Sequence, residues 1–209
     1  MDNQNKKNLK KIFLWTVAII LAAYLILAIA RIPYVLEKDK TDAAVAKIHA
    51  TKLTLDDVMG KNLPPDPGAD ADKTVQGVDA NRNGIRDDVE LAIFKEYPNS
   101  AKTRAVLLQY ALALQMEVVQ PVVNRGTVTA VAEDINRAYI CVWSITSRVD
   151  INKYTKETTK NEDFIKLRQF NTDERKKAHE DFYNGNLGSY SSPDHPSKSC
   201  DLDVTTFTN

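Results

Sequence analysis

The chain has 209 residues, enough for a membrane anchor and one modest folded domain. Lysine plus arginine and aspartate plus glutamate both number 28, so the formal net charge is zero and no electrostatic argument favours nucleic acid as a partner. Charged residues make up 27% of the chain and aromatic residues 8%, proportions at which an ordinary folded domain is expected.

The N-terminus combines a basic flank with a long apolar run. Residues 1–11 carry four lysines, and the uncharged run from Ile12 to Ala30 follows. As a helix, residues 12–30 would be about 28 Å long, close to the thickness of a bilayer core. We expect a transmembrane signal anchor that holds the chain in the cell membrane by a single pass. The basic flank stays in the cytoplasm and everything after Arg31 is extracytoplasmic, in the periplasm or at the cell surface.

A cleaved signal peptide is the alternative, because Ala28, Ile29 and Ala30 form a small-residue cleavage site. Against cleavage, the apolar run exceeds the roughly 7 to 15 residues of a signal-peptide core. Trp15 and Tyr24 also suit a resident helix. The sequence favours the uncleaved anchor, leaves cleavage after Ala30 open, and places the C-terminal part outside the cytoplasm in both cases.

Residues 31–78 are expected to form a stalk and a proline-rich linker. The first part mixes charged and small apolar residues and favours a helix around residues 42–49, where His49 is a lone, solvated histidine. The Pro-rich segment, Leu63 to Val78, contains several prolines, glycines and aspartates and is expected to be extended.

Residues 79–90, DANRNGIRDDVE, match the spacing of a calcium-binding loop at every specified position. A hard cation takes six to eight oxygen ligands, and a tightly wound chain offers alternate side chains to it. Gly84 permits the sharp bend after the first ligands. The oxygen ligands expected for Ca²⁺ are those of Asp79, Asn81, Asn83, the Ile85 carbonyl, Asp87 and Glu90.

A simpler interpretation is that residues 81–84 form a turn and that Asp87, Asp88 and Glu90 are the acidic start of a helix. If the loop binds Ca²⁺, its affinity should be weak, because two of the inner ligands are neutral amides and two arginines lie in the loop. Such a site belongs near the roughly 10⁻⁴ to 10⁻³ M dissociation constants of extracellular modules.

The loop resembles those of the EF-hand superfamily, and more closely the single loops of dockerins and thrombospondin type 3 repeats, in which an aspartate at position 9 is common. A complete EF-hand also has a helix leading into the loop, and the Pro-rich segment cannot hold a regular helix. The chain has no second loop, so the paired switch of calmodulin-like proteins is not implied. The resemblance covers about twelve residues and the helix after them, and it implies Ca²⁺ as the cofactor but no partner.

Apolar residues recur at helical spacing through the rest of residues 79–185, the expected calcium-loop domain. A first helix ends at Pro98, and a second, from Asn99 or Ser100 to Pro121, should be the most buried. Thr127 is expected to cap a third helix, and two more should lie between residues 150 and 185, the last of them peripheral. We therefore expect an all-α protein: one transmembrane helix and a small extracytoplasmic domain of four to five helices with one EF-hand-like loop.

The two cysteines fit an oxidising compartment. Cys141 lies in the third expected helix and Cys200 in a polar tail, residues 186–209, that should be irregular. A Cys141–Cys200 disulfide would stitch this tail to the core, and two unrelated thiols are the alternative.

The motifs of an enzyme are missing. The three histidines lie in unlike segments, and neither a His-Glu-x-x-His nor a Gly-x-Ser-x-Gly motif is present. We expect no enzyme, and interpret the chain as a membrane-anchored, calcium-binding structural or interaction module. The alternative is an accessory or inhibitor subunit that binds a protein partner in the envelope, with a non-essential calcium loop.

Overall fold

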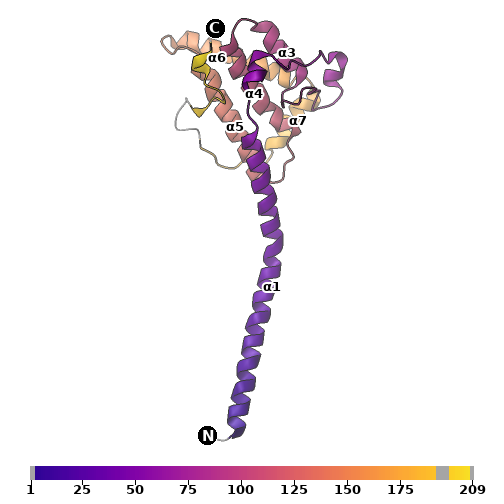
Figure 1. The fold of residues 1–209 in the computed structure, drawn as a ribbon, viewed down its shortest axis with the longest axis vertical. Helices are drawn as coiled ribbons and strands as arrows, with labels where there is room; N and C mark the ends of the chain where they lie inside the picture. Colours follow the sequence, from indigo (N-terminus) through magenta and orange to yellow (C-terminus); the bar gives the residue numbers. More distant parts are fainter. Residues whose placement is uncertain (1–2, 192–197, 208–209) are drawn as a thin grey trace. The chain divides into compact units, whose positions relative to one another are not determined.

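The computed structural model describes residues 3–191 and 198–207, and within these ranges all regular structure is helical (Figure 1). The expectation of an all-α protein is confirmed. The chain divides into two compact units, Met1–Ala43 and Ala44–Asn209. Residues 44–78, expected as stalk and linker, therefore belong to the second unit.

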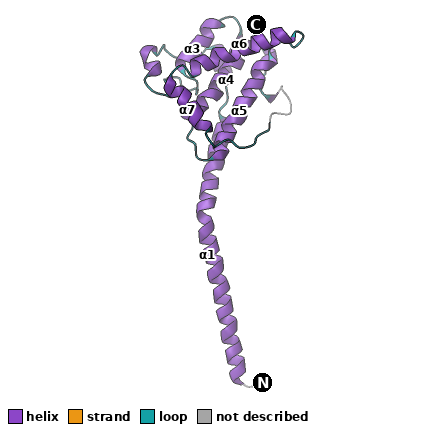
Figure 2. Ribbon diagram, turned by 180° about the vertical axis from the view of Figure 1, so that it is seen from behind, coloured by secondary structure: helices purple, strands orange, loops and turns teal. Residues whose placement is uncertain are grey.

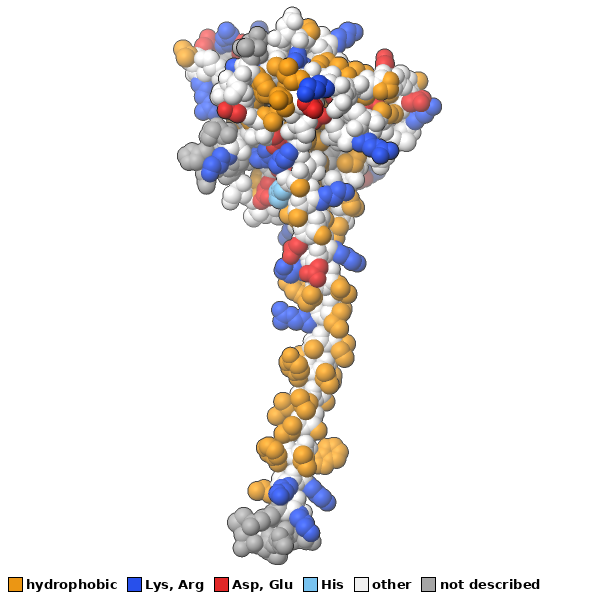
Figure 3. Space-filling view, in the orientation of Figure 1, with side chains coloured by type: hydrophobic (Ala, Val, Ile, Leu, Met, Phe, Trp, Pro, Cys, Tyr) orange, Lys and Arg blue, Asp and Glu red, His pale blue; other side chains and the backbone are white. Residues whose placement is uncertain are grey.

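The described part of the first unit lies within α1, Asn3–Ala50, a continuous helix that is long and apolar enough to cross a membrane. Figure 3 shows hydrophobic side chains along much of α1 and basic side chains near its N-terminal end. Pro33 lies inside this helix. Proline removes one backbone donor, yet the helix continues beyond it, and Lys38 pairs with Asp42 there at 2.6 Å, one turn apart.

The second unit is built around one central helix (Figure 2). This helix, α4, packs against α2, α3, α5, α6, α7 and the 3₁₀ turn η3. A further 3₁₀ turn, η1, lies in the Pro-rich segment. The bounds are α2 Leu55–Met59, η1 Gly68–Asp72, α3 Asp87–Glu96, α4 Ala101–Val119, α5 Arg125–Ser144, α6 Ile151–Gln169, α7 Asp173–Tyr183 and η3 Val204–Thr206.

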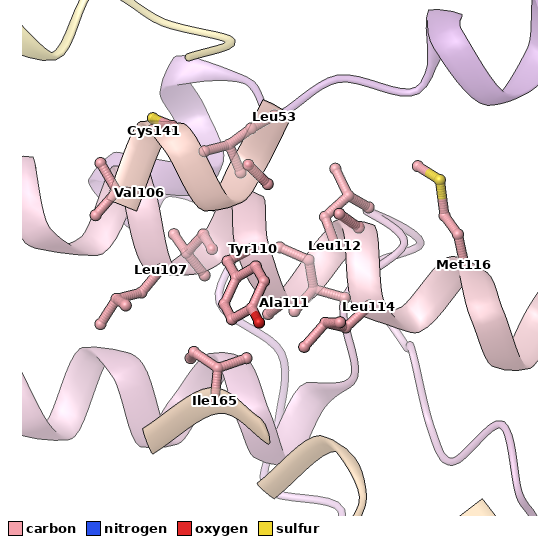
Figure 4. Packing of buried hydrophobic residues seen from close by; sticks show 14 of the residues in the cluster. Leu53, Val106, Leu107, Tyr110, Ala111, Leu112, Leu114, Met116, Cys141 and Ile165 are labelled. Carbon is pink, nitrogen blue, oxygen red and sulfur yellow. The ribbon is translucent and has the colours of Figure 1, made fainter. Parts of the chain in front are cut away.

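Helix α4 is buried on all sides from Arg104 to Glu117, as its run of alanine and leucine predicts (Figure 4). The helix starts where Ser100 accepts the N–H of Thr103 at 3.1 Å. Tyr110, with 1% of its surface exposed, packs in the core with Ile165 of α6 and other apolar side chains. The expectation that this helix is the most buried is confirmed.

The start of α5 corrects one expectation. Asn124, and not Thr127, is the N-terminal cap, since the Asn124 side chain accepts the N–H of Gly126 at 2.9 Å. Thr127 completes a capping box by accepting the backbone N–H of Asn124. In the sequence both residues are good caps three positions apart, so the pattern alone does not separate them.

The C-terminal tail is fixed to the core. Cys141 of α5 and Cys200 form a disulfide, and Gln109 of α4 holds the backbone on either side of it, at Ser199 O (2.8 Å) and Asp201 N (2.9 Å). The expected bridge is thus present in the structure. Residues 192–197 and 208–209 of the tail lie outside the described residues.

Candidate metal centre

In the loop of residues 79–90, side-chain oxygens accept hydrogen bonds from backbone N–H groups of the same loop and hold it in a tight turn. The Asp79 carboxylate accepts the backbone N–H of Asn83 at 3.1 Å and of Gly84 at 3.0 Å. The Asn83 side-chain oxygen accepts the N–H of Ile85 at 2.9 Å. Gly84 has φ +85°, a conformation that glycine adopts without strain and that turns the chain sharply here. The sharp bend expected from the sequence is present at this glycine.

Two of the expected ligands, Asn81 and Asn83, donate hydrogen bonds to a third, Glu90. It lies in the first turn of α3, with 1% of its surface exposed, and accepts hydrogen bonds from the amide nitrogens of Asn81 (3.0 Å) and Asn83 (3.1 Å). Burial is the main cause that raises the pKa of Glu90 to about 7, while the two amides oppose this rise. A buried carboxylate of this kind gains most from a cation placed beside it.

Asp87 occupies the start of α3 and is fully buried. Its carboxylate accepts the N–H of Ala80 through both oxygens, at 3.0 and 3.1 Å. Burial raises the pKa of Asp87, and the Ala80 hydrogen bond partly counteracts this. Asp87 therefore ties the two ends of the loop together, and its backbone N–H adds a bond to Val78 O at 2.9 Å.

The carboxylates do not gather around one point as the amides do. Asp79 and Asp87 bind backbone N–H groups, whereas Glu90 binds the asparagine amides. Among residues 3–191 and 198–207, no group of three or more His, Cys, Asp or Glu side chains could hold a metal ion. The donor set expected from the sequence is different, because it contains two amide oxygens and the carbonyl of Ile85.

Oxygens of Asn81 and Asn83 would face a cation beside Glu90 only after both amides rotate, which breaks the bonds from Ile85 N–H to Asn83 and from the Asn81 amide to Asn62 O. An asparagine amide presents an N–H donor on one side and an oxygen on the other, so a rotation of about 180° exchanges them. The side-chain oxygens of Asn81 and Asn83 would then take the places of the amide nitrogens that now donate to Glu90. Asp79, the first ligand of the pattern, would have to turn from the backbone N–H groups of Asn83 and Gly84 to join such a site.

A buried arginine joins the loop to α6, and sequence reasoning missed it. Arg86 is fully buried; it binds Asp88 at 2.7 and 2.5 Å and donates to the carbonyls of Arg168 (3.1 Å) and Gln169 (3.2 Å). Gly77 passes so close that an added Cβ would lie 2.5 Å from Arg86 Cδ. The sequence signal for this contact is Gly77, beside the loop. Its role as the point of close approach can be seen only once the position of Arg86 is known.

A second buried arginine holds the Pro-rich segment. Arg175 of α7 donates to the carbonyls of Ala71 (2.6 Å), Thr74 (3.1 Å) and Val75 (2.9 Å), and it pairs with Asp72 at 2.5 Å. The segment expected to be extended is therefore folded, with η1 in it, and the Arg175 side chain fixes it. Sequence reasoning placed α7 at the periphery and did not identify this contact.

Helices α4 and α7 also meet at a polar cluster. The buried carboxylate of Glu117 pairs with His179 Nδ1 and accepts the hydroxyl of Tyr183 at 2.5 Å. The bond to Glu117 raises the pKa of His179, while burial opposes the rise. The aromatic ring of Phe170 lies 4.6 Å from the imidazole of His179, between centroids. The cluster fixes α7 to α4.

No family model matches the chain, and neither a curated protein nor a solved structure matches it.

Proposed function

We propose that the protein is a membrane-anchored, extracytoplasmic structural or interaction module whose loop of residues 79–90 binds Ca²⁺. The observation that carries the proposal is the convergence of Asn81 and Asn83 on Glu90, a carboxylate with 1% of its surface exposed. The ion would replace two hydrogen bonds by direct contacts to oxygen and would neutralise a buried charge. The long apolar helix α1 supports a single-pass anchor.

The role of the ion in this proposal is to stabilise the loop against α3. The Pro-rich segment is already held by Arg175, so calcium is not required to order it. Calcium would act on the short stretch between Asp79 and Glu90 and, through Arg86, on the end of α6. A local stabilisation of this kind suits a weak site filled by millimolar calcium outside the cell.

The test is the melting temperature of the full chain in detergent micelles, with and without about 10 mM CaCl₂. For a dissociation constant of about 0.1 to 1 mM, this concentration stabilises the folded form by about 1.4 to 2.7 kcal/mol. The melting temperature should rise by a few degrees. Glu90→Gln should abolish the rise, because the ion then loses its bidentate carboxylate.

Asp66→Asn is the matched control. Asp66 is an exposed acid in the Pro-rich segment, outside the loop, and its replacement should leave the calcium effect unchanged. A wild-type melting temperature that is the same with and without calcium would contradict the site. The same magnitude of shift with Mg²⁺ would point to nonspecific screening instead of a calcium loop.

An alternative function has one observation in its favour. Both oxygens of Glu90 already receive amide hydrogen bonds, so the loop is internally satisfied without a cation. This favours a loop that is only a structural turn, as the alternative of an accessory or inhibitor subunit for an envelope complex requires. Capture of the same protein partner with and without a calcium chelator would support that function, and calcium-dependent capture would contradict it.

A further inference from the structure

The chain contains two Asn-Gly sequences, and they lie in different surroundings. The first, Asn83–Gly84, is part of the loop that carries the expected calcium ligands, and hydrogen bonds of that loop hold both residues. The Asn83 side chain accepts the N–H of Ile85 at 2.9 Å and donates to Glu90 at 3.1 Å. The backbone N–H of Gly84 donates to Asp79 at 3.0 Å. The side chain of Asn83 and the backbone nitrogen after it are therefore both engaged.

The second sequence, Asn184–Gly185, follows α7 and is exposed. Among the described residues, neither the Asn184 side chain nor the Gly185 N–H has a hydrogen-bond partner. A Cβ added to Gly185 would meet no atom within 4 Å, so the space beside this pair is open. The chain is held just after the pair, because the Asn186 N–H donates to Tyr183 O at 3.1 Å. The pair therefore forms the exposed tip of a turn.

An exposed asparagine that precedes a glycine can react with its own backbone. After the glycine N–H loses its proton to water or hydroxide, the nitrogen attacks the side-chain carbonyl carbon of the asparagine. A C–N bond forms to close a five-membered succinimide, and the side-chain nitrogen leaves as ammonia. Water then opens the succinimide at either carbonyl and gives aspartate or isoaspartate. Glycine favours the attack because no Cβ obstructs the approach, and the net reaction consumes only water.

We propose that Asn184 is a site of spontaneous deamidation, which places a negative charge at the C-terminal end of α7 and loosens the last turn of that helix. The charge is unfavourable there because the last carbonyl groups of a helix point towards it, and Asp181 already lies in this turn. Tyr183 of the same turn donates to Glu117 of α4, so the modification acts on the attachment between the two helices. The reaction at Asn184 does not depend on calcium, and Asn83 is protected by the hydrogen bonds of its loop.

Peptide mapping by mass spectrometry tests the site, on the full chain kept in detergent micelles at mildly alkaline pH with a calcium chelator and then digested in acid. Conversion makes the Asn184 peptide about one dalton heavier, because OH replaces NH₂. Asn184 should convert at least about tenfold faster than Asn83, since Asn83 must first lose its hydrogen bonds. In urea that unfolds the chain, the two rates should agree within about twofold, because both residues precede glycine. Asn184→Gln should remove the mass gain from that peptide. Equal rates in the folded chain, or an Asn184 that converts only in urea, would overturn the proposal.

Asn184→Asp reproduces the charged product and tests its effect on α7. In hydrogen exchange of the full chain in micelles, the amides of residues 180–183 should exchange about twofold to fivefold faster than in the wild type. Residues 105–114 of α4 should keep their rate. Asn184→Ser is the matched control, since it removes the same side-chain amide without adding a charge, and it should leave residues 180–183 at the wild-type rate. No acceleration in Asn184→Asp, or an equal acceleration in both variants, would contradict the loosening of α7 by the charge.

Discussion

Arg175 carries a full charge in a fully buried position, and it is compensated mainly by backbone carbonyls. Asp72, its one acidic partner among the described residues, has a half-exposed side chain, and the Arg175 bond is the main cause that lowers the pKa of Asp72. Each carbonyl bound by Arg175 belongs to a chain segment with few backbone bonds of its own. The arginine therefore replaces the secondary structure that the Pro-rich segment lacks.

Arg175→Met should lower the free energy of unfolding by about 3 kcal/mol, because the carbonyls of Ala71 and Val75 lose their side-chain donor, and Thr74 O and Asp72 each keep one other donor. Urea denaturation of the full chain in micelles, followed by tryptophan fluorescence, measures the change. Lys176→Met is the matched control: Lys176 is the next residue, is mostly exposed, and should change stability by no more than about 0.5 kcal/mol. Equal effects of the two substitutions would contradict the role assigned to Arg175.

The contacts of the two buried arginines, Arg86 and Arg175, could not be predicted from the sequence. The spacing of residues 79–90 indicates which side chains belong to a loop, because the ligands lie on one short stretch and the pattern is local. The backbone carbonyls that Arg86 binds lie more than 80 positions away, and those that Arg175 binds lie about 100 positions away. Charged side chains are usually exposed to solvent, so the sequence predicts that both arginines are exposed. In the tertiary structure both are buried.

At the scale of helices, α7 is attached to α4 by two donors from α7 to one acceptor, Glu117. The groups that face His179 are Glu117, Glu180 and Lys166, together with the rings of Phe170 and Tyr183. The bond to Glu117 raises the pKa of His179 above its unfolded value. This bond therefore contributes stability fully below about pH 6.5, and the contribution is lost as the pH rises through the folded-state pKa.

His179→Gln should cost more stability at about pH 6 than at about pH 8.5. The difference between the two costs should be about 1 kcal/mol or less, because the imidazole is partly exposed and solvent screens its charge. Urea midpoints at the two pH values measure it. Tyr183→Phe removes the other donor to Glu117 without removing a group that titrates in this range, so its cost should be the same at both. A pH-independent cost of His179→Gln would show that no protonation is involved.

The helices themselves were largely predictable. Apolar spacing, the proline stops and the Ser100 cap are local signals, and the structure places α4 where they predict. The continuation of α1 through Pro33 was not predicted, because a proline usually ends a helix and the residues beyond it are polar. An exposed helix of this length depends on the summed propensity of its residues, which a short pattern understates.

At the scale of the whole second unit, the C-terminal tail joins segments that are far apart in sequence. Asp201 follows the disulfide and accepts the N–H of Leu53 at 3.0 Å, in the linker between α1 and α2. The same carboxylate pairs with Arg137 of α5, and Gln109 of α4 holds its backbone. One residue of the tail therefore links the start of the unit to two of its central helices.

Replacing both cysteines, by Cys141→Ala with Cys200→Ala, should lower the free energy of unfolding by about 4 kcal/mol, since loop-closure entropy is regained by the unfolded chain. Exchange of the Leu53 amide should also accelerate, because Asp201 is its acceptor and loses its covalent support. Urea denaturation and hydrogen exchange of the full chain measure the two effects. Ser144→Ala is the control: its hydroxyl lies 3.7 Å from Cys200 Sγ, but it forms no covalent link and should leave Leu53 protected. If the double variant kept the wild-type exchange rate at Leu53, contacts other than the disulfide would be holding the tail in place.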